Sequence, residues 1–137
     1  MEIISFIKNS KIYNNTAIIY DIDDTVIDKY GNPIWPILST YKYALSKGLK
    51  VFIITARVDT FPNNENTIRQ LKSVGMGEFE MIFLRPYYMA DIAKYKLIAR
   101  KIINDMGFNV IASIGDMPWD MGAYGGKGFL VNDYIKV

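Results

Sequence analysis

The chain has 137 residues, of which half are hydrophobic and 22% are charged, so its composition is that of one globular domain with a single core. Its formal net charge of +2 comes without a block of basic residues, which leaves a nucleic-acid partner possible but unsupported by charge. Cysteine and histidine are both absent, which excludes disulfides, thiolate nucleophiles, cysteine-ligated zinc and a histidine general base.

Membrane and export signals are also absent from the sequence as given. No apolar stretch approaches the roughly 20 residues that a membrane-spanning helix needs. Residues 1–15 lack both the apolar run and the small-residue cleavage site of a secretory signal. We therefore expect a soluble, cytoplasmic protein with no membrane partner, organised as a single domain over residues 1–137.

Apolar runs of strand length alternate with segments of helical period along the chain. In chain order, the pattern predicts a strand at 17–22, a helix at 36–47, a strand at 50–54, a helix at 64–74, a strand at 79–84, a helix at 90–106, and strands at 109–114 and 128–131. Gly48, Gly75 and Gly107 follow the three helices as stop signals. Almost continuously apolar strands that alternate with helices predict an α/β fold, a three-layer α/β/α sandwich with about five parallel strands.

Polar residues follow several of the predicted strands, at the edge where open parallel sheets bind their ligands. In chain order they are Asp21, Asp23, Asp24 and Thr25, then Thr55 and Arg57, then Lys94 and Lys96 in the helix after the third strand, and finally Asp116 and Asp120. Each strand-to-helix turn would deliver its polar residues to the same edge of the sheet. We expect the strand of Asp21 at the centre, flanked by those that lead to Thr55 and Asp116.

These residue types suit phosphoryl chemistry. Clustered carboxylates repel one another, and burial raises their pKa, so they need a cation. A hard divalent ion, here Mg2+, prefers oxygen ligands and also binds substrate phosphate. An activated carboxylate can then form an aspartyl-phosphate intermediate, while Lys and Thr hold the phosphoryl oxygens as charge spreads over them.

Four segments resemble the signatures of haloacid dehalogenase-like (HAD-like) phosphatases, in the order of that family. They are I-I-Y-D-I-D-D-T at 18–25, V-F-I-I-T-A-R at 51–57, K-L-I-A-R at 96–100 and I-G-D-M-P-W-D at 114–120. Within the superfamily the resemblance is closest to the plant and class B acid phosphatases, because N-E-N-T-I-R-Q-L-K-S-V-G and G-F-N-V-I-A-S-I-G-D are similar to their segments. The resemblance implies a HAD-like, Rossmann-type core and a phosphomonoester hydrolase.

For the first signature, the resemblance implies that Asp21 is the nucleophile and a metal ligand. Asp23 would protonate the leaving group, then act as base for the hydrolytic water, and offer its backbone carbonyl to the metal. Thr25 is a candidate for substrate binding.

For the other signatures, the resemblance implies that Thr55 and Lys96 bind the transferring phosphoryl group. Asp116 would be the third protein contact of the metal, with Asp120 acting behind it or through water. Lys94 is the alternative to Lys96, because positions i and i+2 of a helix do not share a face.

Side chains beyond these motifs have less specific expectations. Arg57 is a candidate for contact with the substrate, and Trp119, inside the fourth signature, is a candidate to border it. Trp35 and Tyr87 are expected to pack against the protein. Asp24 is expected to cap its own loop rather than bind a ligand.

The short connections after the first and second signatures leave no room for a cap domain, so the site is expected to be open to large phosphorylated substrates or to a second copy in a homo-oligomer. A polynucleotide 3'-phosphatase or a nucleotidase is the alternative on the same chemistry. From other classes, a phosphate- or phospholipid-binding module and a signalling receiver domain remain alternatives. A receiver is disfavoured because its acceptor Asp and its acidic pair lie on different strands, whereas Asp21 and Asp23 follow the same one.

Overall fold

The computed structural model describes residues 2–134, so residues 1 and 135–137 of the predicted domain lie outside the described part. Its elements are α1 (Glu2–Lys8), β1 (Thr16–Tyr20), α2 (Trp35–Ser46), β2 (Lys50–Val58), α3 (Phe61–Ser73), β3 (Met81–Arg85), α4 (Ile92–Asp105), β4 (Asn109–Gly115), η1 (Pro118–Asp120), β5 (Lys127–Leu130) and η2 (Val131–Asp133). Every predicted helix and strand occurs with shifted ends. Helix α1 and the two short 3-10 turns were not predicted.

The helix ends follow local capping chemistry. Helix α3 begins before the predicted residue 64, because the Oγ1 of Thr60 accepts a hydrogen bond from the backbone N–H of Asn63 at 3.3 Å. Helix α4 begins after Asp91, whose Oδ1 accepts from the backbone N–H of Lys94 at 3.0 Å. The predicted stop glycines at 48, 75 and 107 all have positive φ, at 86, 84 and 95°, which suits a residue without Cβ.

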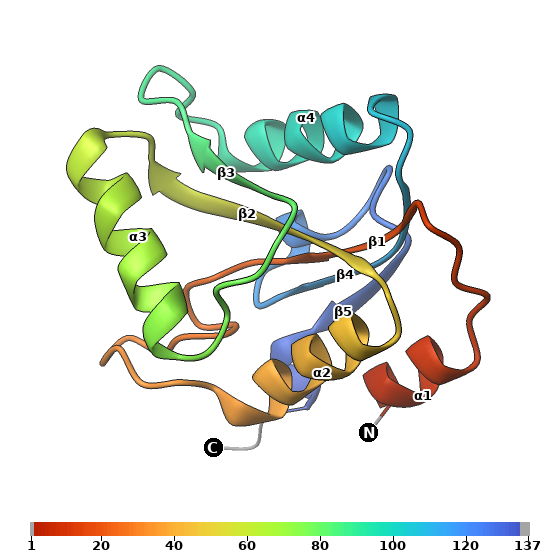
Figure 1. The fold of residues 1–137 in the computed structure, drawn as a ribbon. Coiled ribbons are helices and arrows are strands. Elements are labelled where there is room, and N and C mark those ends of the chain that lie inside the picture. The colour runs from red at the N-terminus through yellow and green to blue at the C-terminus, as the bar shows by residue number, and fades with distance from the viewer. Residues whose placement is uncertain (1, 135–137) are drawn as a thin grey trace.

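All five strands run parallel in the order β3-β2-β1-β4-β5 (Figure 1). The strand that leads to Asp21 is therefore central, with β2 and β4 as its neighbours, as predicted. Strand β2 is longer than predicted and runs through Thr55 and Arg57 to Val58. Its pairing with β3 shifts register between Ile54 and Val58, so these two polar residues occupy the irregular end of the strand rather than a following loop.

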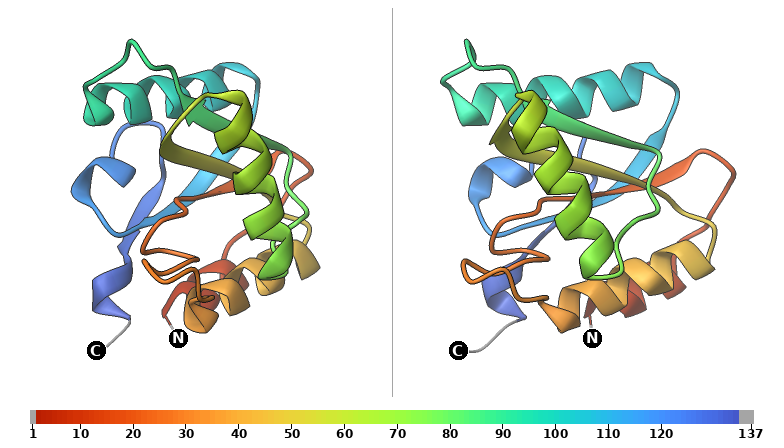
Figure 2. Two further views of the ribbon diagram at one scale, coloured as in Figure 1. Left: turned by 90° about the vertical axis from the view of Figure 1, so that its left-hand side faces the viewer. Right: turned by 60° about the vertical axis from the view of Figure 1, so that its left-hand side comes forward.

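Two apolar clusters lie on the two faces of the sheet. Helices cover both faces and make the three layers (Figures 1 and 2). Ile18 and Tyr20 belong to the cluster that α1, α2 and α3 cover. Ala17 and Ile19, one position out of phase, belong to the cluster that α4 covers. This alternation is the period of two that a strand imposes on its side chains. The predicted α/β/α sandwich is confirmed.

The connection between β1 and α2, residues 21–34, is a short flap with isolated bridges that join Asp23 to Ile27 and Ile27 to Pro33. Across residues 2–134 there is no separate cap domain, as the short connections predicted. The helices found in that range include none with the length and hydropathy of a membrane-spanning segment.

Candidate active site

Asp21 lies one residue beyond β1, at the carboxyl edge of the sheet. It continues the phase of Ala17 and Ile19, so its side chain is directed to the face that α4 covers. The residue is only 9% exposed. Both carboxylate oxygens accept a hydrogen bond: Oδ1 from Lys96 Nζ at 2.9 Å and Oδ2 from Thr25 Oγ1 at 3.0 Å. A carboxylate is thus held at the centre of the sheet edge by two side chains from different elements.

Lys96, rather than Lys94, reaches this carboxylate. Lys96 is 2% exposed and its Nζ also donates to the Ile54 carbonyl at 2.7 Å, whereas Lys94 is exposed. Helix α4 buries Tyr95 and Lys96 side by side, and Ala99 and Arg100 one turn later. These buried positions lie on the face of α4 that packs against the sheet, so Lys96 points towards the end of β1. Lys94, two residues earlier, lies on the face exposed to solvent.

Asp116 and Asp120 join Asp21 in a cluster of three carboxylates. One oxygen from each lies within 4.8 Å of the others. Lys96 Nζ is also 2.7 Å from Asp120 Oδ1, so the ammonium pairs with two of the three carboxylates. A carboxylate oxygen has two lone pairs, so an oxygen that is paired with Lys96 can still contact a further ligand. Asp120 thus lies within the cluster.

Gly115 makes room for this cluster. A Cβ on Gly115 would overlap the side chain of Asp120, so the position has to lack a side chain. Asp120 is held in place by its own turn, because its Oδ2 accepts from the backbone N–H of Met117 at 3.1 Å. Packing therefore explains why a glycine precedes Asp116 in the fourth signature, in addition to the chemistry of the aspartates.

The three carboxylates have the electrostatic features of a cation site. Burial raises the pKa of Asp21 to about 6, with Lys96 opposing the rise and the neighbouring Asp116 adding to it. Burial also raises the pKa of Asp116, and the proximity of Asp120 adds to it. Burial followed by repulsion from Asp21 raises the pKa of Asp120. Converging all-oxygen donors under mutual repulsion fit a hard divalent cation.

The remaining predicted residues take positions around the cluster. Thr55 is fully buried, and its Oγ1 accepts from the backbone N–H of Arg57 at 3.1 Å. The guanidinium of Arg57, a predicted substrate contact, points to Asp23, with Nη2 2.8 Å from Oδ1 and Nε 3.0 Å from Oδ2. Trp119 is half-buried, and its carbonyl accepts from Arg100 Nη1 at 2.9 Å.

Three supporting residues have no place in the sequence-based site. Thr67 and Gln70 on α3 accept hydrogen bonds from Arg57 Nη1 at 3.1 and 2.6 Å. Arg100 is 4% exposed and also donates from Nε to the Ala123 carbonyl at 2.9 Å, so it braces the loop that carries Asp120. The motif K-x-x-x-R includes Arg100 but does not indicate its role. Thr67 and Gln70 belong to no motif.

Two aromatic expectations are wrong. Trp35 and Tyr87, expected to pack, have 58% and 80% of their surface exposed. Trp35 opens α2 and its ring lies under the ammonium of Lys42, 5.6 Å from the ring centroid. Tyr87 forms an edge-to-face pair with Tyr88 on the loop after β3, which is also largely exposed, at 72%. Among the described residues, no helix or strand packs over either side chain, because the connections at the carboxyl edge of the sheet are short.

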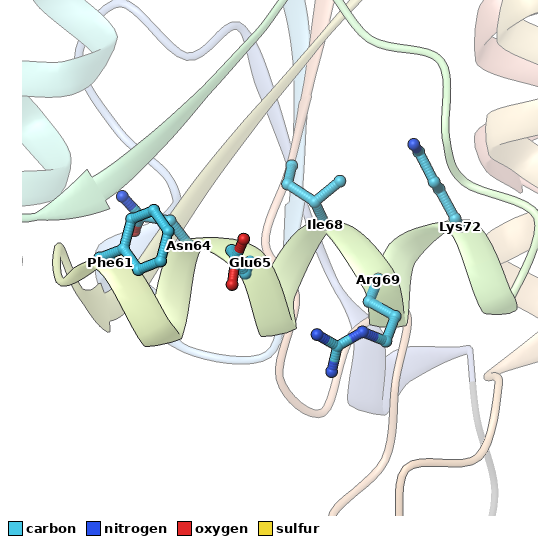
Figure 3. Close-up of a pocket in the computed structure, with 6 residues that line it drawn as sticks. All are labelled: Phe61, Asn64, Glu65, Ile68, Arg69 and Lys72. Carbon is cyan, nitrogen blue, oxygen red and sulfur yellow. The ribbon is translucent and has the colours of Figure 1, made fainter.

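A hollow of about 480 Å³ lies apart from the carboxylates, along one side of α3 (Figure 3). Its lining residues are Phe61, Asn64, Glu65, Ile68, Arg69 and Lys72. Thr67 and Gln70 leave the same helix on another side, as 3.6 residues per turn requires. We place the active site at the strand ends, because the hollow contains none of the clustered carboxylates.

Comparison with known proteins identifies the family of the chain. Residues 31–132 match the family described as HAD superfamily, subfamily IIIB (Acid phosphatase), a range that holds Thr55, Lys96, Asp116 and Asp120 and begins after Asp21. Among curated proteins, none matches the chain significantly.

One solved structure, titled "Structure of Pnkp1/Rnl/Hen1 complex", contains a chain with a TM-score of 0.68 and 19% sequence identity. The alignment covers 88% of this chain and 47% of that chain, so this protein spans about half of its length and the likeness concerns the fold alone. The family match, by contrast, extends over most of the chain. The protein therefore belongs to subfamily IIIB of the HAD superfamily, the acid phosphatase subfamily.

Proposed function

We propose that the protein is a Mg2+-dependent phosphatase that works through an aspartyl-phosphate intermediate on Asp21. The observation that carries the proposal is the buried Asp21 carboxylate at the end of the central strand, held by Lys96 and Thr25 beside two further carboxylates. A nucleophile at this place can be reached from the carboxyl edge of the sheet, where no cap domain covers residues 2–134.

In the first half-reaction, a carboxylate oxygen of Asp21 attacks phosphorus and the bond to the leaving group breaks. Asp23 gives its proton to the departing oxygen, which avoids release of a free alkoxide. Lys96 and the hydroxyl of Thr55 hold the equatorial oxygens, on which negative charge accumulates in the transition state. Lys96 already pairs with Asp21, so the transferring group arrives next to its ammonium.

In the second half-reaction, Asp23 takes a proton from water as the water oxygen attacks phosphorus. The bond between phosphorus and the Asp21 oxygen breaks, which releases inorganic phosphate and restores both aspartates to their starting states. Asp23 suits this double use because its side chain is 58% exposed and can meet both the leaving group and solvent.

Asp21, Asp116 and Asp120 would hold the cation, together with the backbone carbonyl of Asp23. When bound, Mg2+ neutralises the clustered carboxylates and the phosphoryl oxygens and keeps Asp21 ionised at neutral pH. The residues fit this role, because one oxygen from each carboxylate lies within 4.8 Å of the others and all three donors are oxygen atoms.

The test is hydrolysis of p-nitrophenyl phosphate by the wild type and by Asp21→Asn, each with Mg2+ and with EDTA. Asp24→Asn is the matched control, because Asp24 is exposed and Asn tolerates its positive φ of 59°. We expect turnover that requires metal, is lost in Asp21→Asn and survives in the control. Acid-quenched wild type should carry one phosphoryl group on the peptide with Asp21. Turnover by Asp21→Asn would refute the assigned nucleophile, and phosphate binding without turnover would favour a binding module.

A nucleotide or a polynucleotide 3'-phosphate is the second candidate substrate. The observation in its favour is the exposed pair of Tyr87 and Tyr88 on the loop after β3, at the same edge of the sheet as Asp21, since aromatic rings of this kind can stack on nucleobases. A panel of 3'-phosphorylated oligonucleotides, nucleoside monophosphates and sugar phosphates tests it. Loss of a preference for nucleotides in a Tyr87→Ala, Tyr88→Ala double variant would support the candidate, and equal rates on all substrates would contradict it.

A further inference from the structure

Arg57 anchors the carboxylate of Asp23. The guanidinium approaches it side-on, with Nε donating to Oδ2 at 3.0 Å and Nη2 to Oδ1 at 2.8 Å. A bidentate pair of this kind fixes the plane of the carboxylate as well as its distance. No other described side chain hydrogen-bonds to the carboxylate of Asp23, which is 58% exposed. Its orientation therefore depends on Arg57.

Arg57 is itself held on the side away from Asp23. Its Nη1 donates to Thr67 Oγ1 at 3.1 Å and to Gln70 Oε1 at 2.6 Å, both on α3. With one hydrogen on Nε, two on Nη1 and one on Nη2 in use, four of the five guanidinium N–H groups have partners. Little remains for a phosphoryl group, so the arrangement disfavours Arg57 as a substrate ligand.

The geometry also leaves Asp23 able to transfer a proton. A carboxylate has about four lone-pair positions, and Arg57 takes one on each oxygen. The second position on each oxygen stays available for a proton on its way to the leaving group or from water. The Arg57 side chain is 20% exposed and the Asp23 side chain 58%, so the arginine is the more enclosed partner and the carboxylate faces solvent.

We propose that Arg57 is a positioning residue for proton transfer: Thr67 and Gln70 hold the guanidinium, and the guanidinium aims the carboxylate of Asp23 at the leaving group. This inference rests on the proposed function, in which Asp23 is the acid and base. It assigns Arg57 a role through Asp23 instead of a contact with the substrate.

The test compares kcat/KM for p-nitrophenyl phosphate, which has a good leaving group, with that for phenyl phosphate, which has a poorer one. Arg57→Ala should lower kcat/KM for phenyl phosphate by about 10- to 100-fold, within the range of general acid catalysis, and for p-nitrophenyl phosphate by much less. Arg57→Lys should restore little, because an ammonium cannot hold a carboxylate side-on. Arg69→Ala, an exposed arginine on α3, is the matched control and should leave both rates unchanged.

A double-mutant cycle separates positioning from substrate binding. On an Asp23→Ala background, Arg57→Ala should have almost no further effect, because there is no carboxylate left to aim. A loss that persists on that background, falls on KM and is equal for the two leaving groups would show that Arg57 binds the phosphoryl group, and would overturn the proposal.

A readout without turnover is the NMR signal of the Arg57 Nε–H group. In the wild type, we expect this N–H group to be protected from exchange with water. The protection should be lost in Asp23→Ala and in the double variant Thr67→Val, Gln70→Ala. It should persist in Arg69→Ala. If the exchange rate of this N–H group is the same in Asp23→Ala as in the wild type, Arg57 does not anchor Asp23, whatever the activity of the variant. A protected signal in a wild type without turnover on either ester refutes the proposed function, and with it the proton-transfer role, while the anchoring itself stands.

Discussion

Replacing Asp21 by Asn should abolish turnover and yet stabilise the metal-free protein at neutral and alkaline pH. In the wild type, the Asp21 side chain is 11% exposed and lies beside Asp116, so ionisation in the absence of a cation is unfavourable. Asn keeps the shape of the side chain and removes the charge. The effect is expected only without metal, because a bound divalent ion favours the ionised carboxylate.

The magnitude follows from the pKa of Asp21, which burial raises to about 6 from an ordinary value of 3.8. Because the folded value is the higher one, this carboxyl contributes stability that is complete below about pH 4 and is lost as pH rises through about 6. At about 1.4 kcal/mol per unit of pKa, the wild type should lose about 3 kcal/mol of unfolding free energy through this group by pH 8. Asp21→Asn should not lose it.

The assay is urea unfolding in EDTA between pH 4 and pH 8, with Asp24→Asn as the control that keeps the buried carboxylate. The two variants should differ little at pH 4, and Asp21→Asn should be the more stable one at pH 8. Added Mg2+ should then stabilise the wild type, by about 2.7 kcal/mol at a concentration 100 times its Kd, and leave Asp21→Asn almost unchanged. A less stable Asp21→Asn at pH 8 in EDTA would refute the electrostatic reasoning.

Three further predictions concern the surroundings of the cluster. Lys96→Met should lower kcat/KM by about 100-fold or more, since it removes a donor to the transition state, whereas Lys94→Met should retain near wild-type turnover. Gly115→Ala should cost about 1–3 kcal/mol in urea unfolding because its Cβ overlaps the side chain of Asp120, and an unchanged midpoint would contradict that packing. Arg100→Ala should destabilise by about 1–3 kcal/mol because two carbonyls lose their donor, with Arg100→Lys a poor substitute; a wild-type midpoint in the Ala variant would argue against this brace.

Much of the fold and the arrangement of its catalytic edge could be predicted from the chain alone. Strand-length apolar runs that alternate with helical periods require a parallel sheet covered on both faces, and the structure has one. Asp21, Thr55 and Asp116 come together because parallel strands end at a common edge, which is a property of topology and not of particular contacts. The metal and the roles of these residues stay predictions.

Local signals beyond the motifs were less informative. Helix α1 is one short element whose Ile3 and Ile7 become buried against the sheet layer, and seven residues carry too little periodicity to stand out. Trp35 and Tyr87 have the residue types of a core, and only the absence of a neighbouring element leaves them exposed. The extra length of β2 comes from the irregular pairing near Val58, which depends on a partner strand.

The sequence by itself determined which residue types meet at the sheet edge, because periodicity sets the elements and the elements set where each strand ends. Tertiary structure alone decided which side chains satisfy one another there. Arg57 reaches Asp23, 34 residues away, and is held by α3 in turn, while Lys96 crosses from α4 to Asp21, 75 residues away. Such contacts depend on the position of one element over another to within a hydrogen-bond length, and no pattern within a single segment encodes that distance.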